Sequence, residues 1–313
     1  MPVVKDANRL ALGAAQLGMD YGIANHTGKP GKGEAFRLLE RLWNAGLRWY
    51  DTAPAYGESE IVLGAFLAGR SDAHEAMVVS KLPVDFSSSN VQPLKKALAQ
   101  SLERLQISSL AGLMLHREEQ LDDWDELRPL MDALLEAGLV RDFGVSVYSP
   151  KAALNALDVA ELGMIQVPAN ILDHRFRRQH FFDAAARAGK RVFIRSVFLQ
   201  GLLFATDEDF ARRQERIRYL DRDRARLWIG RVRELAERFS MPVHSLALAY
   251  VREAFPEARV LIGVETVEQA ERNLTAWRSP LPVGALEEVE RAFSSVEDEI
   301  VHPPYWRRGS LNC

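Results

Sequence analysis

Short apolar runs alternate along the chain with longer amphipathic segments. Eight of these runs are three to five residues long and largely free of polar alternation: 10–12, 49–51, 77–81, 112–116, 143–147, 164–167, 192–195 and 260–263. Runs of this length are too short for helices, and strands that are buried on both faces of a parallel sheet have this character. The pattern therefore predicts eight buried parallel strands.

The segments between these runs have the period of amphipathic helices. Phe36, Leu39 and Trp43 recur at steps of three and four residues, and the same spacing runs through 91–105 and 228–239. Several of these segments end at a glycine such as Gly46, where a chain leaves a helix through the left-handed conformation. The chain is therefore predicted to repeat strand, helix, strand.

The number of repeats distinguishes between two α/β folds. Eight strand–helix units over 313 residues average about 39 residues each, which fits a closed (β/α)₈ TIM barrel. An open dinucleotide-binding sheet would carry Gly-x-Gly-x-x-Gly after its first strand, but residues 12–18 read Leu-Gly-Ala-Ala-Gln-Leu-Gly. The sequence favours the barrel. We expect residues 1–313 to form a single domain, because no stretch has the character of a linker.

Charge and cysteine content limit the partners and the compartment. Lys and Arg number 40 against 43 Asp and Glu, for a net charge of −3, so there is no electrostatic case for nucleic acid or an anionic membrane. The longest apolar stretch, 192–205, is shorter than the roughly 20 residues that a membrane span needs. The only cysteine is Cys313 and no leader-like segment is visible, so we expect a cytoplasmic protein.

Four polar residues fall at or just after the ends of neighbouring predicted strands. Asp51 ends the second strand, Lys81 the third and His116 the fourth, and Tyr56 lies in the loop that leaves the second strand. Catalytic groups of a (β/α)₈ barrel lie at the C-terminal ends of its strands. We therefore expect these four side chains on one rim of the barrel.

Together these side chains are suited to protonating a carbonyl oxygen. A phenol has a pKa of about 10, and a neighbouring ammonium favours its phenolate, so Lys81 is expected to lower the pKa of Tyr56. Asp51 would keep Lys81 charged, and His116 would donate a hydrogen bond to a substrate oxygen. Taken singly, each residue is explained as well by a turn, a surface lysine or a structural histidine. Their occurrence at consecutive strand ends favours the catalytic interpretation.

The segments that carry these residues resemble the aldo-keto reductase family. Residues 51–57 read Asp-Thr-Ala-Pro-Ala-Tyr-Gly, and segments ending in Lys81 and His116 follow in the family's order. The resemblance covers nearly the whole chain. It implies a catalytic tetrad of Asp51, Tyr56, Lys81 and His116, and a barrel that binds an extended nicotinamide dinucleotide without a Rossmann fold. No metal ion is expected.

The resemblance also implies contacts to the cofactor, which we expect to be NADP(H), with NAD(H) as the alternative. Ser146 and Gln166 match residues that hold the nicotinamide carboxamide, although Val147 stands where the family usually has an asparagine. Asn170 matches an asparagine that often follows. Arg195 stands where many members stack a tyrosine on the nicotinamide, and its flat guanidinium would stack there and add a positive charge.

The other implied contacts follow the seventh and eighth strands. They are Ser196, Leu199 and Gly201 around the pyrophosphate, and Gly263, Glu265, Gln269, Arg272 and Asn273 around the adenosine. The second group is also explained as a helix N-terminus, which is itself a place for phosphate. Glu265 would repel a 2′-phosphate whereas Arg272 would attract it, so we expect weak discrimination between NADP(H) and NAD(H).

The rim loops and the C-terminal tail are expected to line a substrate pocket. The predicted contacts are Tyr21, Tyr56, His116 and Trp306, with Tyr305 and Arg307 beside the last. Such a pocket would suit a sugar aldehyde, an aromatic aldehyde or a ketone. A reductase of such small carbonyl compounds is favoured by the complete tetrad. A non-catalytic nucleotide-binding partner subunit or redox sensor, and an epimerase, stay open as alternatives, and the sequence does not indicate the oligomeric state.

Overall fold

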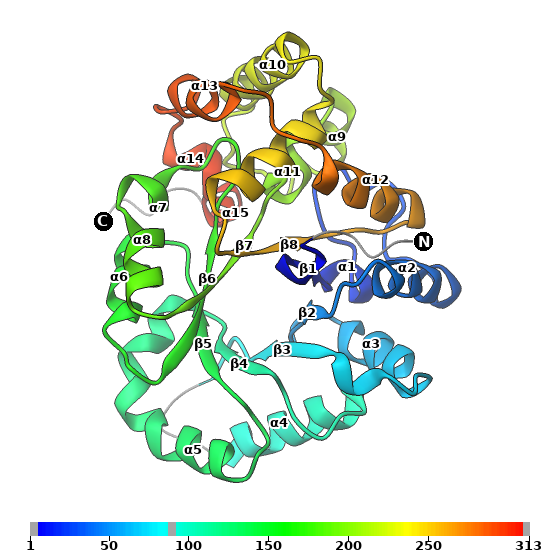
Figure 1. Cartoon of the computed structure of the whole chain (residues 1–313), viewed down its shortest axis with the longest axis vertical. Helices are drawn as coiled ribbons and strands as arrows, with labels where there is room; N and C mark the ends of the chain where they lie inside the picture. Colours follow the sequence, from blue (N-terminus) through cyan, green and yellow to red (C-terminus); the bar gives the residue numbers. More distant parts are fainter. Residues whose placement is uncertain (1–5, 87–91, 309–313) are drawn as a thin grey trace.

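Eight parallel strands form a closed barrel in the computed structural model, which describes residues 6–86 and 92–308. Each strand pairs with the next along the chain, and β8 pairs with β1. Helices surround the barrel on its outside (Figure 1). The predicted (β/α)₈ TIM barrel is confirmed; Val91 and Cys313 lie outside the described residues.

All eight predicted strands are present, and their ends differ from the prediction by at most two residues. The strands are β1 (Leu10–Gly13), β2 (Trp49–Asp51), β3 (Met77–Lys81), β4 (Gly112–Leu115), β5 (Phe143–Ser146), β6 (Leu162–Pro168), β7 (Arg191–Arg195) and β8 (Arg259–Ile262). Strand β6 begins earlier than predicted because Leu162 pairs with Phe143, before the register shifts between Phe143 and Gly144.

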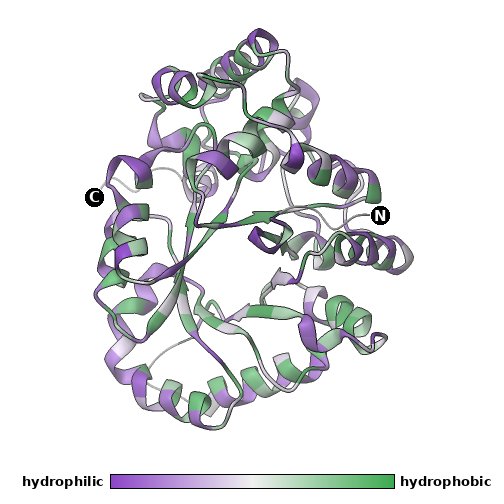
Figure 2. Cartoon of the chain, in the orientation of Figure 1, coloured by the Kyte–Doolittle hydropathy of each residue, from purple (hydrophilic) through white to green (hydrophobic). Residues whose placement is uncertain are grey.

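The helices around the barrel bury apolar residues that recur at steps of three and four, such as Leu38 and Leu42, as their periodicity predicted, and their ribbons carry hydrophobic and hydrophilic residues by turns (Figure 2). They are α1 (Ala15–Gly18), α2 (Lys32–Asn44), α3 (Ser59–Ala68), α4 (Gln92–Leu105), α5 (Trp124–Glu136), α6 (Pro150–Leu157), α7 (Arg175–Arg178), α8 (Phe181–Arg187), α9 (Asp207–Arg212), α10 (Arg222–Arg238), α11 (Val243–Ala254), α12 (Val267–Arg278), α13 (Ala285–Ala292), α14 (Asp298–Val301) and α15 (Pro303–Arg308). Short 3-10 helices are η1 (Ala7–Arg9), η2 (Ala73–Glu75), η3 (Glu118–Asp123) and η4 (Leu199–Phe204). Within the described ranges, no helix has both the length and the apolar character to cross a bilayer.

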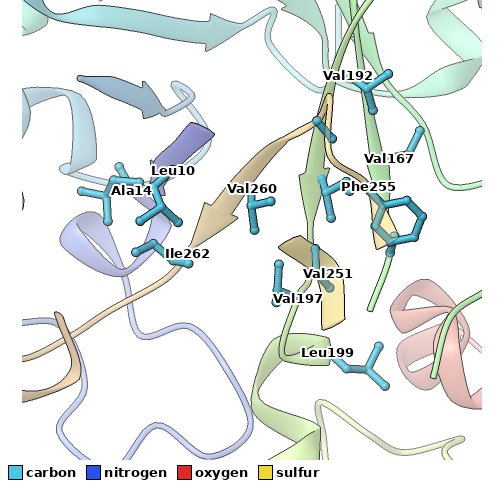
Figure 3. Close-up of a cluster of buried hydrophobic side chains, with 14 of the residues drawn as sticks. Leu10, Ala14, Val167, Val192, Val197, Leu199, Val251, Phe255, Val260 and Ile262 are labelled. Atoms are coloured by element: carbon cyan, nitrogen blue, oxygen red, sulfur yellow. The ribbon is translucent and has the colours of Figure 1, made fainter. Parts of the chain in front are cut away.

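Apolar side chains fill two layers, one inside the barrel and one between the strands and the helices. The inner layer consists of Ala11, Trp49, Val79, Ala111, Met114, Met164, Phe193 and Leu261. Part of the outer layer is seen in Figure 3, where side chains of β1, β6, β7 and β8 gather with Val251 of α11 and Leu199 of η4. Both layers are closed to water, so polar side chains that point inwards need partners.

Above the inner apolar layer, at the C-terminal ends of the strands, the inward-pointing residues are polar or small. Side chains alternate along a strand, so the residue two positions after an inner-layer residue also points inwards. For seven strands, these positions are Gly13, Asp51, Lys81, His116, Gln166, Arg195 and Gly263. The alternation therefore brings the candidate catalytic residues together at one end of the barrel.

Candidate active site

Lys81 and Asp51 form a buried ion pair at the barrel mouth. The Lys81 ammonium donates to both Asp51 carboxylate oxygens at 2.7 Å and to the carbonyl oxygen of Thr52 at 3.2 Å. The two side chains are only 1% and 7% exposed. The register of β2 with β3 places Asp51 opposite Val79, two residues before Lys81. The structure thus brings together the two residues that the sequence pattern paired.

A chain of hydrogen bonds extends this pair across the barrel mouth. The Gln166 amide Nε2 donates to Asp51 Oδ1 at 2.8 Å, and the Ser146 hydroxyl donates to Gln166 Oε1 at 3.1 Å. The family resemblance implied that Ser146 and Gln166 contact the cofactor, and nothing in the sequence linked them to Asp51. The link depends on closure of the barrel, which brings β2 opposite the neighbouring strands β5 and β6, and no local sequence signal specifies this.

Tyr56 and His116 lie beside the ion pair. The Lys81 nitrogen is 4.9 Å from the centroid of the Tyr56 ring, and the Tyr56 and His116 rings meet edge to face with centroids 5.8 Å apart. A Cβ atom at Gly18 would lie 1.8 Å from the Tyr56 carbonyl oxygen, so the loop that carries Tyr56 requires glycine there. His116 Nδ1 is buried and has no hydrogen-bond partner among the described residues.

The protonation states of Tyr56 and His116 are set mainly by burial. Burial and the Asp51 charge raise the pKa of the Tyr56 hydroxyl well above its usual value, while the Arg195 charge lowers it. The expectation that Lys81 gives Tyr56 a lowered pKa is therefore wrong for this structure, because Asp51 neutralises the ammonium and the phenol is removed from water. Burial, followed by the charge of Lys81, lowers the pKa of His116 to about 3. At neutral pH both groups are uncharged.

A cavity of about 210 Å³ connects this cluster with the N-terminal end of α12. It reaches the cluster at Asp51 and Tyr56, and it is also bounded by Tyr21, which the sequence analysis assigned to the substrate. Nine of the predicted cofactor residues line it: Gln166, Arg195, Ser196, Gly201, Gly263, Glu265, Gln269, Arg272 and Asn273. Residues from four different loops thus enclose one continuous space.

Three predicted cofactor contacts are not part of the described cavity wall. Ser146 lies beneath it, bonded to Gln166. Asn170 accepts hydrogen bonds from two backbone N–H groups of its own turn and donates to the Ser196 carbonyl oxygen at 3.1 Å. Leu199 is fully buried in the outer core (Figure 3). Asn170 therefore positions Ser196, and Leu199 anchors its loop by packing.

Trp306, a predicted substrate contact, also lies away from the described cavity wall. Its side chain is 2% exposed, and its indole Nε1 donates to the Glu299 carbonyl oxygen at 3.0 Å. The tail therefore turns this aromatic ring into the core. Arg307 is exposed. Burial raises the pKa of Tyr21, and the charges of Arg195 and Arg307 oppose that rise.

The far end of the cavity is built around the first turn of α12. The Thr266 hydroxyl caps this helix by accepting from the Gln269 N–H, and the Gln269 side-chain oxygen accepts from the Glu265 N–H at 2.7 Å. Glu265 is half-buried on the cavity wall, where burial raises the pKa of its carboxyl group. Arg272 supplies a cation one turn along the helix.

His244, which no sequence pattern indicated, also lines this end. Its ring stacks on Phe198 with centroids 5.0 Å apart, and its Nε2 is hydrogen-bonded to the Asn273 side chain. Burial lowers its pKa. In the sequence, only its place two residues after Pro242, at the start of a helix, sets His244 apart. In the structure this helix, α11, packs on α12.

Within the described ranges, no three His, Cys, Asp or Glu side chains are grouped to hold a metal ion.

Comparison with known proteins identifies relatives over nearly the whole chain. The D-threo-aldose 1-dehydrogenase of a Pseudomonas species is 26% identical over 90% of this chain and 95% of its own length. A norsolorinic acid reductase of Emericella nidulans is 25% identical over 90% of this chain and 77% of its own.

Solved structures share the fold. An aldo-keto reductase from Bacillus halodurans in its holo form superposes with a TM-score of 0.73 at 22% identity, covering 94% of this chain and 95% of that one. A glycerol dehydrogenase from Gluconobacter oxydans has a TM-score of 0.71 at 21% identity, covering 91% of each chain. The model of the Aldo/keto reductase family matches residues 9–292. The chain is therefore an oxidoreductase that belongs to the aldo/keto reductase family.

Proposed function

We propose that this single-domain protein reduces an aldehyde or ketone to the alcohol with NAD(P)H, and that Tyr56 is the general acid. One observation carries the proposal. The neutral phenol of Tyr56 lies on the wall of a cavity, next to the buried Lys81–Asp51 pair. The other end of the same cavity is lined by the cation of Arg272 and by the N-terminus of α12. The first arrangement serves proton transfer, and the second suits a phosphorylated nucleotide.

The residues along the cavity fit a nicotinamide dinucleotide. Gln166 presents an amide at the catalytic end, and Arg272 together with the first turn of α12 would bind phosphate or ribose at the other end. Backbone can approach closely at Gly201, which has a φ of +85° and where a Cβ atom would lie 3.1 Å from the Ala24 nitrogen. Members of the family generally use NAD(P)H. We propose NADP(H) as the cofactor, with NAD(H) as the alternative.

The side chains of the tetrad divide the work of proton transfer. When bound, the reduced nicotinamide supplies the hydride to the carbonyl carbon. The Tyr56 hydroxyl donates its proton to the carbonyl oxygen, and it is protonated at neutral pH because burial raises its pKa. The Lys81 ammonium, held charged by Asp51, stabilises the phenolate that forms. His116 is neutral and lies edge-on to Tyr56, so it would donate a hydrogen bond to the same oxygen without competing as an acid.

We propose a small sugar or aromatic carbonyl compound as the substrate. Tyr21 and Tyr56 present aromatic faces at the catalytic end of the cavity, and Gln166 adds a polar group. The names of the relatives refer to an aldose in one case and to norsolorinic acid in another. The cytoplasmic location inferred from the single cysteine stays a prediction.

The test is a panel of aldose sugars, aromatic aldehydes and simple ketones, with the absorbance of reduced cofactor as the readout. We expect net consumption of NADPH or NADH with at least one class, and its loss in Tyr56→Phe. A partner subunit or redox sensor would bind nucleotide without any absorbance change. An epimerase would convert its substrate while the absorbance stays constant, so chromatography of the products separates these alternatives from the proposal.

A further inference from the structure

Arg195 presents a fixed cation to the catalytic end of the cavity. Its Nη2 donates to the Val147 carbonyl oxygen at 2.9 Å, and its guanidinium carbon lies 3.8 Å from the centroid of the Tyr148 ring. Arg195 lines the cavity, whereas Tyr148 is not among the described residues that do. The tyrosine therefore contacts the guanidinium at the cavity wall, and the charge of Arg195 acts on Tyr56, whose pKa it lowers against the larger effects of burial and Asp51.

The wall behind Arg195 is itself braced. The Tyr148 and Ser149 N–H groups donate to one carboxylate oxygen of Glu118 at 2.6 and 2.9 Å. The Tyr148 ring stacks on His302 with centroids 5.2 Å apart and an interplanar angle of 20°. The backbone that accepts the hydrogen bond from Arg195 and the ring that contacts its guanidinium are thus both fixed by further contacts, which favours keeping the charge at this end of the cavity.

The charges at this end of the cavity do not cancel. Lys81 is paired with Asp51, and within the described part of the chain Arg195 forms no ion pair. His116 and Tyr56 are uncharged at neutral pH, as described above. The Glu118 carboxylate lies behind Tyr148, where it accepts from two backbone N–H groups. Among the side chains that line this end of the cavity, Arg195 therefore carries the positive charge that no carboxylate pairs.

We propose that Arg195 determines which redox state of the nicotinamide the protein prefers, so that the reduced, neutral ring binds more tightly than the oxidised, cationic ring. This inference rests on the proposed function. A ring that passes a hydride to a carbonyl held by Tyr56 must enter the end of the cavity that Gln166 and Arg195 enclose. Like charges repel one another more strongly at a partly buried site than in bulk water.

The repulsion acts on the oxidised cofactor, which is the product form in carbonyl reduction. Adenosine, ribose and phosphate groups are the same in both redox states, so their contacts cancel in the ratio of the two affinities. Only the nicotinamide ring changes charge, so the repulsion from Arg195 affects the oxidised form and not the reduced one. In carbonyl reduction the cationic ring is the product, so Arg195 promotes its release, which is a step that often limits turnover.

The experiment measures dissociation constants of the oxidised and reduced cofactor by fluorescence titration. The proteins are the parent, Arg195→Met, Arg195→Gln and Arg195→Lys, and the midpoint of thermal unfolding checks that each is folded. We expect the parent to bind the reduced form at least tenfold more tightly, which corresponds to about 1.4 kcal/mol. Arg195→Met and Arg195→Gln should lower this ratio by about tenfold, whereas Arg195→Lys, which keeps the charge, should retain most of it.

Arg272→Met is the matched control, because Arg272 is a cation on the same cavity at the nucleotide end. It should weaken both redox states by one common factor and leave their ratio unchanged. The inference is overturned if Arg195→Met also changes both states equally, or if its only effect is a raised KM for carbonyl substrates that carry a carboxylate. A parent that binds neither redox state of either cofactor would instead refute the proposed function, so the two failures are distinguishable.

Discussion

Replacing Lys81 with methionine leaves the Asp51 carboxylate buried without its cation. In the parent, the ammonium donates to both carboxylate oxygens at 2.7 Å, and the two side chains are 1% and 7% exposed. Water cannot replace the lost charge at such a site, and the Gln166 amide at 2.8 Å is the remaining side-chain donor among the described residues. Removing one partner of a buried ion pair typically costs about 3–5 kcal/mol. We therefore expect Lys81→Met to lower the free energy of unfolding by about that amount.

Urea unfolding followed by far-ultraviolet circular dichroism at pH 7 measures this loss. The control is the double variant Lys81→Met with Asp51→Leu, which removes both charges and should regain most of the stability. A deficit under about 1 kcal/mol, or a double variant as unstable as the single one, would refute the reasoning.

Further predictions concern turnover, cofactor preference and packing. Tyr56→Phe should lower kcat by about 10²–10⁴-fold and leave nucleotide affinity intact, so near-normal turnover would show that another group is the acid. Glu265→Arg should shift preference towards NADP(H), measured by dissociation constants for both cofactors; a parent that already prefers NADP(H) by about a hundredfold, or 2.7 kcal/mol, would contradict the weak discrimination expected. A Cβ atom at Gly64 would lie 2.1 Å from the Arg104 carbonyl oxygen, so Gly64→Ala should destabilise the fold by about 1–3 kcal/mol. Gly230→Ala, a helical site with nothing within 4 Å, should instead stabilise it by about 0.5–1 kcal/mol in the same urea assay.

The strands and the positions of Asp51 and Lys81 were predictable for a physical reason. A strand of a closed parallel barrel is covered on both sides, so it appears as an uninterrupted apolar run, and a polar residue that ends such a run is conspicuous. Asp51 and Lys81 were found in this way. The alternation of side chains then requires both to point into the barrel mouth.

Other features of the site depend on contacts that a local pattern does not contain. Gln166 donates to Asp51 across 115 residues of sequence, and this bond follows from closure of the barrel. Trp306 is aromatic and lies in the tail, but residue type does not distinguish a ring packed in the core from one that faces a cavity. The pKa of Tyr56 depends on its burial and on the neutralisation of Lys81, and both are properties of the assembled site.

The seam between β8 and β1 has a consequence for biosynthesis. At this seam the Arg9 side chain donates to the carbonyl oxygens of Arg252, Phe255 and Ala258, the last of which is 249 positions away along the chain. A growing chain therefore carries β1 as an open edge, able to pair with other chains, until β8 has left the ribosome. Asp51 and Lys81 are made early, whereas the nucleotide end of the cavity is made with α12. The edge of β1 is therefore covered, and the nucleotide end of the cavity completed, in the same late step of folding.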